Sequence, residues 1–232
     1  MLSAVSFLTV VGRARTPGPT TFRWFPLVGA LIGAAVAAAL AGGREIWALP
    51  VAAAVAVAVD LAVTGLLHVD GLADSADGLL PHLERERRLE VMRLPDTGAF
   101  GVGVVAVVLL LRFATLTDPA VEPWSLVAVW SISRTAAAAV PGFVPYARAE
   151  GLASAFLAGP DRWILLAVVP ALALLAVTQQ GTGIAAGLAA LVAAAGVVGL
   201  ARARLGGFTG DVLGATILVS ETVALLVLAA HR

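Results

Sequence analysis

The chain of 232 residues contains no cysteine, no lysine and only one tyrosine, and charged residues make up only 13% of it. The absence of cysteine excludes a disulfide-stapled secreted domain. A formal net charge of zero without a basic tail argues against a nucleic-acid binder. Hydrophobic residues make up 60% of the chain, which is more than a soluble domain uses, so part of the apolar surface is expected to face lipid.

Seven apolar stretches are long enough, or nearly long enough, to cross a bilayer core of roughly 30 Å. They cover residues 25–41, 46–67, 98–116, 124–144, 163–178, 184–201 and 212–230. The first eleven residues are apolar but too few to cross, and they predict a short interfacial or buried helix. No repeat or polar linker divides the chain. We therefore predict a single domain over residues 1–232, an all-α polytopic integral membrane bundle with about seven transmembrane helices and a short N-terminal helix.

The distribution of arginine predicts how the bundle is oriented. Eleven arginines lie in the connecting stretches 12–24, 68–97, 145–162 and 202–211, whereas the opposite connections and the C-terminus hold only Arg44 and Arg232. By the positive-inside rule the first set is cytoplasmic. We expect a multi-pass protein of the cytoplasmic membrane, with its polar chemistry on the cytoplasmic face.

The densest polar segment covers residues 68–78 and begins with His68. At about 100° per helical residue, Asp70, Asp74 and Asp77 share a helix face about 60° wide. Crowded carboxylates are unfavourable unless a cation or a shared proton relieves them. Oxygen ligands of this kind suit Mg²⁺, and the single histidine without cysteine makes zinc a poor fit. The alternative is a solvated helix end with scattered acids.

Two glycine-rich segments are expected to begin helices and to present N–H groups to an anion. In the first, Arg93 precedes Gly98; in the second, Thr209 precedes Asp211. The alternatives are an amphipathic helix over residues 85–93 on the headgroups, glycines that serve packing, and an N-cap by Thr209 or Asp211.

Four charged residues fall inside the apolar stretches. A charge at a helix centre costs about 2.5–3.5 kcal/mol on insertion scales, so each is a functional candidate. Arg112 is expected to snorkel from near a helix end. Arg134 either pairs with Asp60 or Glu221, or it reaches an anionic substrate within the bundle. In the connecting stretch 145–162, Arg148 either contacts substrate or only follows the positive-inside rule.

Taken together, these segments resemble one family over nearly the whole chain, the cobalamin synthases or adenosylcobinamide-GDP ribazoletransferases. The most specific match is His-x-Asp-Gly-Leu-Ala-Asp-x-x-Asp-Gly at residues 68–78. Further matches, in the same order along the chain, cover residues 25–29, 64–65, 87–93, 98–101, 133–134, 148–152 and 206–214.

The resemblance implies a Mg²⁺-dependent transferase that joins adenosylcobinamide-GDP to α-ribazole or its 5′-phosphate. The products would be adenosylcobalamin or its 5′-phosphate, and GMP. Such transfer depends on positioning and charge neutralisation. The implied partners are these two substrates and the lipid bilayer, with no nucleic acid; a homo-oligomer or association with other corrinoid-pathway enzymes stays open.

We accordingly expect each candidate residue to have a definite role. The metal ligands are Asp70, Asp74, Asp77 and Asp211. The substrate-binding residues are Arg93, Arg134, Arg148, Gly98, Thr209 and Gly210. The catalytic residues are Asp74, Asp77 and His68, with an aspartate favoured as proton acceptor because His68 faces about 160° away from the aspartates on a regular helix.

Two other functions compete with this one. Asp74-Ser75-Ala76-Asp77-Gly78 also begins the motif of CDP-alcohol membrane phosphotransferases, but the rest of that motif is absent. An ion-coupled transporter would also place charges inside the bilayer. Transporter sites lie near the midplane, whereas most polar residues here gather toward one face.

Overall fold

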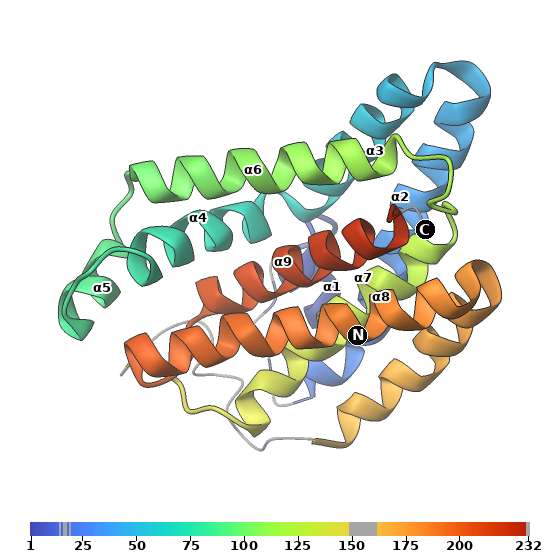
Figure 1. The fold of residues 1–232 in the computed structure, drawn as a ribbon. Helices are drawn as coiled ribbons and strands as arrows, with labels where there is room; N and C mark the ends of the chain where they lie inside the picture. Colours follow the sequence, from blue (N-terminus) through green and yellow to red (C-terminus); the bar gives the residue numbers. More distant parts are fainter. Residues whose placement is uncertain (14, 16–17, 19, 149–161, 231–232) are drawn as a thin grey trace.

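The computed structural model describes all residues except 14, 16–17, 19, 149–161 and 231–232. Its described part is built of α-helices and contains no β-strand (Figure 1), which confirms the predicted all-α class. The helices are α1 (Leu2–Leu8), α2 (Phe25–Ile46), α3 (Leu49–Thr64), α4 (Leu67–Leu79), α5 (Arg85–Val91), α6 (Ala99–Leu116), α7 (Ser125–Ala139), α8 (Val168–Leu205) and α9 (Gly210–Leu228). Short 3-10 helices cover Thr21–Trp24, Val140–Gly142 and Arg162–Ala167.

Several helices are long and apolar enough to cross a membrane. Four segments meet both conditions, and α3 with α4 forms a fifth candidate that is bent by 88°. The four segments are Thr21–Ile46, Ala99–Leu116, Trp163–Leu205 and Gly210–Leu228. The chain is therefore a multi-pass membrane bundle.

Two features explain why the structure has fewer candidate spans than the seven predicted from the sequence. α7 has only 15 residues. α8 contains a break at Gln180 (φ 53°, ψ −137°), where two helices meet. The two arms of α8 run in opposite directions (Figure 1), which confirms the break predicted between residues 178 and 184. The number of crossings stays a prediction.

α9 forms the centre of the bundle. It packs against α4, α6, α7 and α8, and it is the most enclosed of the candidate spans. Because its neighbours surround it, polar side chains on α9 meet protein rather than lipid. The consequence is visible at Glu221, which is fully buried.

An ion-pair cluster joins α9 to α3 and α6. Arg112 on α6 donates from Nη2 to Asp60 Oδ2 at 2.6 Å and from Nη1 to Glu221 Oε2 at 2.8 Å. Trp130 Nε1 donates to Asp60 Oδ1 at 2.9 Å, and the guanidinium carbon of Arg112 lies 4.9 Å from the Trp130 ring centroid. Arg112 is buried, so the expectation that it snorkels was wrong: its partners lie inside the bundle.

Arg134 on α7 completes this cluster. It pairs with Glu221 and donates from Nη1 to Ser133 Oγ at 2.9 Å, while Ser133 Oγ donates to Glu221 Oε1 at 2.8 Å. Pairing with Glu221 is thus one of the two arrangements expected for Arg134. The buried ion-pair cluster (Asp60, Arg112, Arg134 and Glu221) contains two carboxylates and two guanidiniums, which compensates charges that would be costly in a low-dielectric interior.

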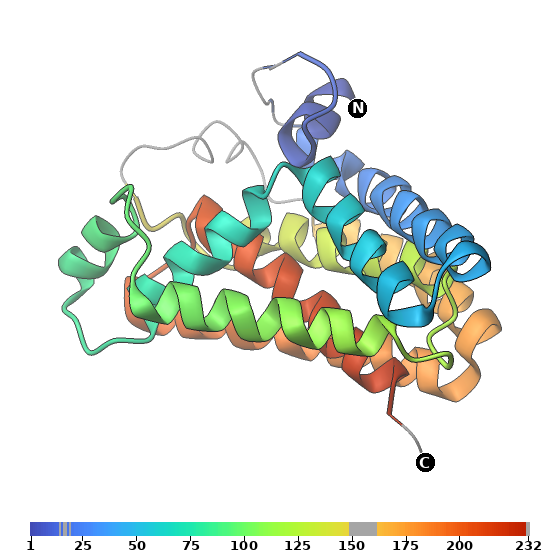
Figure 2. The ribbon, with the colours of Figure 1, turned by 90° about the horizontal axis from the view of Figure 1, so that it is seen from above.

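The N-terminal run forms the predicted short helix, α1, which lies beside the bundle (Figure 2). Ala4 and Leu8 are buried, and the ring of Phe7 stacks on that of Phe25 with a centroid distance of 5.9 Å. α1 is therefore attached to the start of α2.

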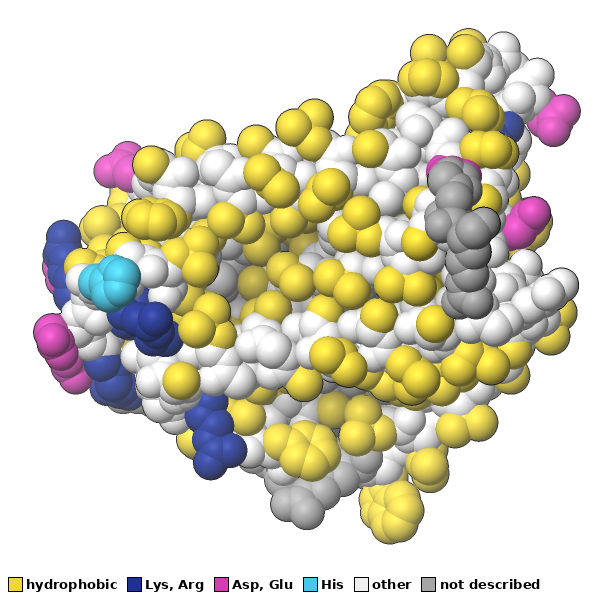
Figure 3. Space-filling view, viewed as in Figure 1, with side chains coloured by type: hydrophobic (Ala, Val, Ile, Leu, Met, Phe, Trp, Pro, Cys, Tyr) yellow, Lys and Arg dark blue, Asp and Glu magenta, His cyan; other side chains and the backbone are white. Residues whose placement is uncertain are grey.

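Charged side chains gather at one end of the molecule, around α5 (Figure 3). We call this the arginine-rich end. Its exposed or partly exposed arginines are Arg85, Arg87, Arg93, Arg202 and Arg204. The candidate site lies at this end.

Candidate active site

The direction of α4 brings its acids toward α9. The chain leaves α3 through two residues with left-handed backbone, Gly65 (φ 60°) and Leu66 (φ 61°), and then turns by 88° into α4. α4 consequently runs along α6 and α9 (Figure 1) instead of continuing α3.

Glycines allow α4 and α9 to touch at the backbone. A Cβ atom at Gly71 would lie 2.8 Å from the carbonyl oxygen of Asp211, and one at Gly214 would lie 3.3 Å from His68 Cα. Small residues permit such close approach between membrane helices. The N-terminus of α9, with Asp211, therefore lies directly against the acidic face of α4.

This contact creates an acidic cluster, which we define as Asp70, Asp74 and Asp211. The negative charge of Asp74 is disfavoured first by burial, then by Asp211 and Asp70, and Arg148 opposes these effects. The segment from Leu67 to Leu79 is helical, as the predicted shared face requires. Three of the four carboxylates expected to bind the metal, Asp70, Asp74 and Asp211, thus lie close enough to influence one another's charge.

Asp77 has a different role from its neighbours on α4. Its Oδ2 accepts the backbone N–H of Gly98 at 2.6 Å, and its Oδ1 accepts that of Gly101 at 2.9 Å. The N–H groups at the start of α6, which were expected to bind a substrate anion, therefore bind the carboxylate of Asp77. The Gly98 N–H is therefore not free for a substrate phosphate, which corrects that expectation, whereas each oxygen of Asp77 keeps a further lone pair and the metal or catalytic role of Asp77 stays a prediction.

Arg148 holds Asp211 at the acidic cluster. Its Nη2 donates to Asp211 Oδ2 at 2.8 Å and to the Met92 carbonyl at 3.3 Å. Thr209 Oγ1 also donates to Asp211 Oδ2, at 3.1 Å, and accepts the N–H of Val212, so Thr209 is the N-cap of α9. Arg148 Nε is buried and has no hydrogen-bond partner in the described part of the chain.

Backbone pairing fixes the loop that carries Arg148. Ala147 N–H donates to the Phe208 carbonyl at 2.8 Å, and Phe208 N–H donates to the Pro145 carbonyl at 2.9 Å. Partial burial raises the pKa of the Tyr146 phenol, and Arg148 opposes this shift. Tyr146 is therefore a neutral group beside the charged cluster at neutral pH.

Two arginines of α5 connect this helix to the C-terminal ends of α4 and α8. Arg88 is buried and donates from Nη1 to the carbonyls of Gly78 at 2.7 Å and Leu79 at 3.1 Å, at the C-terminus of α4. Arg85 donates to the last carbonyl of α8, on Leu205, at 2.7 Å and to Ala147 at 3.1 Å. A cation at a helix C-terminus is favoured by the helix dipole. The residues 85–93 thus hold α4 and α8 in place.

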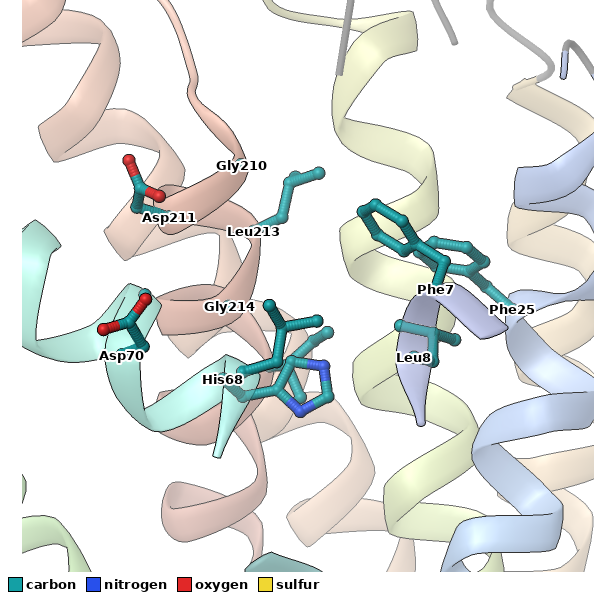
Figure 4. A pocket seen from close by; sticks show the side chains of 12 residues that line it. Phe7, Leu8, Phe25, His68, Asp70, Gly210, Asp211, Leu213 and Gly214 are labelled. Carbon is teal, nitrogen blue, oxygen red and sulfur yellow. The ribbon is translucent and has the colours of Figure 1, made fainter. Parts of the chain in front are cut away.

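A cavity of about 120 Å³ adjoins the acidic cluster (Figure 4). Its walls include Phe7 and Leu8 of α1, Phe25 of α2, His68 and Asp70 of α4, and Asp211 of α9. His68 is only 3% exposed, and its Nε2 has no partner among the described residues. Although His68 and Asp70 lie on opposite sides of α4 in a regular helix, both reach this cavity.

Most predicted site residues meet here. His68, Asp70, Gly210 and Asp211 line the cavity, and Asp74, Arg148 and Thr209 lie around it. Arg134 belongs to the buried ion-pair cluster, and Arg93 is exposed at the arginine-rich end.

The sequence interpretation did not assign a role in the site to the apolar cavity residues, among them Phe7, Leu8 and Phe25. The only available signal for them was the pair of aromatic residues on either side of the first connecting stretch.

The chemistry of the acidic cluster suits a divalent cation. It offers only carboxylate oxygens, which Mg²⁺ prefers, and a cation would relieve the repulsion on Asp74. Within the described ranges, however, no group of three or more His, Asp or Glu residues is arranged to hold a metal ion. The donor types fit Mg²⁺, and the metal stays a prediction.

The fold and the site define a class: a multi-pass membrane protein whose carboxylates and arginine gather beside a cavity at one end. The family described as cobalamin-5-phosphate synthase matches the chain over residues 1–229. The chain therefore belongs to this family.

Curated relatives agree with this assignment. Proteins named adenosylcobinamide-GDP ribazoletransferase are 40% identical in Syntrophobacter fumaroxidans (98% of this chain, 96% of the relative) and 39% identical in Azorhizobium caulinodans (87% and 80%). One from Chlorobaculum tepidum is 33% identical (97% and 92%). No solved structure matches the chain. The chain is thus an enzyme, a transferase of cobalamin synthesis.

Proposed function

We propose that this chain joins adenosylcobinamide-GDP to α-ribazole or its 5′-phosphate and releases GMP, in a Mg²⁺-dependent reaction. The proposal is carried by one observation: the acidic cluster and Arg148 lie together beside a cavity, in a chain of this family. In the reaction a ribose hydroxyl attacks the corrinoid-side phosphorus of the diphosphate. A new P–O bond forms, and the P–O bond to the departing GMP breaks.

When the acceptor is α-ribazole 5′-phosphate, its 5′ oxygen already carries the phosphate that is retained in the product. The attacking hydroxyl is therefore a different hydroxyl of the ribose. Asp74 is the proposed proton acceptor, since it is a half-buried carboxylate and burial is the largest of the effects that disfavour its charged form. A carboxylate in this condition gains most from taking up a proton.

Arg148 is the proposed contact for diphosphate oxygens. Its Nε is unpartnered among the described residues, while its Nη2 is held by Asp211. The guanidinium fork suits phosphate oxygens. Asp70 and Asp211 would hold Mg²⁺ beside Asp74, and the metal would supply charge neutralisation of the diphosphate. Arg93, exposed at the same end, would add positive charge along the approach.

We place this site on the cytoplasmic face of the cytoplasmic membrane. The support is the arginine-rich end, which coincides with the connections that carry most arginines in the sequence. Both substrates are charged or polar and are expected to approach from the cytoplasm.

The test is a turnover assay with purified protein, Mg²⁺, GDP-activated corrinoid and α-ribazole, in which GMP and the joined corrinoid are measured. Asp74→Asn should lower turnover by roughly a hundredfold or more, because it removes the proton acceptor. The matched control is Glu86→Gln, an acid at the same end with an 82% exposed side chain, which should leave turnover within about twofold.

Two results would contradict the proposal. The first is an Asp74→Asn protein that folds normally and retains wild-type turnover. The second is wild-type protein that releases CMP from CDP-diacylglycerol and no GMP from the GDP-activated corrinoid.

A further inference from the structure

We infer that the cavity between α1, α4 and α9 holds the aromatic base of the acceptor nucleoside, with His68 as its polar contact. This inference rests on the proposed function and adds to it a location for one substrate. The first argument is the order of burial along the cavity. Asp70 and Gly210 are exposed, whereas Leu8, Phe25 and His68 are at most 3% exposed. A nucleoside would thus have its ribose at the acids and its base at the buried end.

Size is the second argument. The cavity of about 120 Å³ is comparable to the apolar cavity of about 150 Å³ that binds benzene in an engineered protein. A flat aromatic base can therefore enter with small adjustments of the wall. A corrin macrocycle is several times larger and must bind elsewhere.

The chemistry of the walls is the third argument. Away from the acids the lining is apolar, with Phe7 and Leu8 on one side and Leu213 on the other (Figure 4), and it also includes Ile217. Guanine presents several donors and acceptors on its edge, and burying them without partners is costly. A benzimidazole attached to ribose presents a single ring nitrogen as acceptor, which an apolar pocket with one polar group can satisfy.

His68 supplies that polar group. His68 lines the cavity, and its Nε2 is buried and has no partner in the described part of the protein. Buried polar nitrogens are nearly always hydrogen-bonded, so an unpartnered one at a cavity indicates a ligand atom. With its proton on Nε2, His68 would donate to the ring nitrogen of the base. In this role His68 orients the nucleoside, and Asp74 remains the proton acceptor.

The position of α1 gives the inference a sharp test. Phe7 is partly exposed and forms the outer wall, so Phe7→Ala enlarges the cavity without emptying the protein core. We expect Phe7→Ala to raise the KM for α-ribazole by about tenfold, with kcat and the KM for the GDP-activated corrinoid within about twofold. The control is Phe22→Ala, since Phe22 packs on the same Phe25 ring at 4.8 Å and does not line the cavity.

A second pair of variants isolates the polar contact. His68→Leu should raise the KM for α-ribazole about tenfold, because it removes one hydrogen bond. His68→Gln retains an N–H donor and should recover part of this loss. The control is His82→Leu, which alters an exposed histidine away from the cavity.

Binding of α-ribazole alone, measured by equilibrium dialysis, separates this inference from the proposed function. If the wild-type protein shows no turnover, the proposed function is contradicted. Even then, weaker binding of α-ribazole to Phe7→Ala than to Phe22→Ala in dialysis would support the cavity assignment. If wild-type protein turns over and Phe7→Ala leaves the KM for α-ribazole unchanged, the inference is wrong. A rise in the KM for the GDP-activated corrinoid alone would assign the cavity to guanine and would also overturn it.

Discussion

Substitution of Asp77 tests whether this carboxylate stabilises the fold or takes part in the reaction. Asp77→Ala removes two hydrogen bonds, to the N–H groups of Gly98 and Gly101, and the second of these lies in a buried contact. An unsatisfied buried N–H costs about 1–3 kcal/mol, and loss of a helix cap costs about 1 kcal/mol more. We therefore expect the free energy of unfolding to fall by about 2–4 kcal/mol. Asp77→Asn retains one carbonyl acceptor and should lose about half as much.

The assay is thermal unfolding of purified protein in detergent, with and without Mg²⁺. For a chain of this length each kcal/mol shifts Tm by about 2–4 °C, so Asp77→Ala should unfold several degrees below wild type. Without Mg²⁺ the matched control is Asp70→Ala on the same helix, which removes an exposed carboxylate and should shift Tm by about 1 °C or less. An Asp77→Ala protein with unchanged Tm and abolished turnover would refute the capping role and return Asp77 to the chemistry.

Three further predictions follow from contacts elsewhere in the bundle. Arg112→Gln leaves Asp60 and Glu221 without their shared cation and should destabilise the protein by about 3–5 kcal/mol, seen as a lower Tm in detergent; an unchanged Tm would show that the cluster adds nothing to stability. Arg148→Ala should lower turnover by at least tenfold with little change in Tm, because its side chain is partly exposed and contacts Asp211; full turnover would remove it from the site. Removal of divalent cations with EDTA should abolish turnover until Mg²⁺ is restored, and turnover that survives exhaustive chelation would argue against a metal at the acidic cluster.

Patterns within one helix made much of the fold and the acidic face predictable. Apolar length located α2, α6 and α9, and a helical period of about 3.6 residues placed Asp70 and Asp74 on one side of α4. These predictions succeeded because they depend on residues a few positions apart.

The contacts that were missed join residues far apart in the sequence. Asp77 meets Gly98 after 21 residues, and Arg112 meets Glu221 after 109. The helical period within one segment cannot reveal such pairs. The sequence therefore predicted a substrate anion at the start of α6, where Asp77 binds, and a snorkelling side chain at Arg112, which is buried. The turn into α4 was also missed, because Leu66 adopts a left-handed backbone that its residue type does not favour.

The buried ion-pair cluster has a consequence for how the protein is made. A helix released alone into lipid with an unpaired carboxylate or guanidinium would carry a penalty of about 2.5–3.5 kcal/mol. Glu221 lies on α9, which is synthesised after α6 and α7, yet it neutralises arginines on both of these helices. Until α9 is inserted, Arg112 and Arg134 have only the carboxylate of Asp60 to offset their charge. A chain cut short before residue 210 would therefore leave uncompensated positive charge in the membrane.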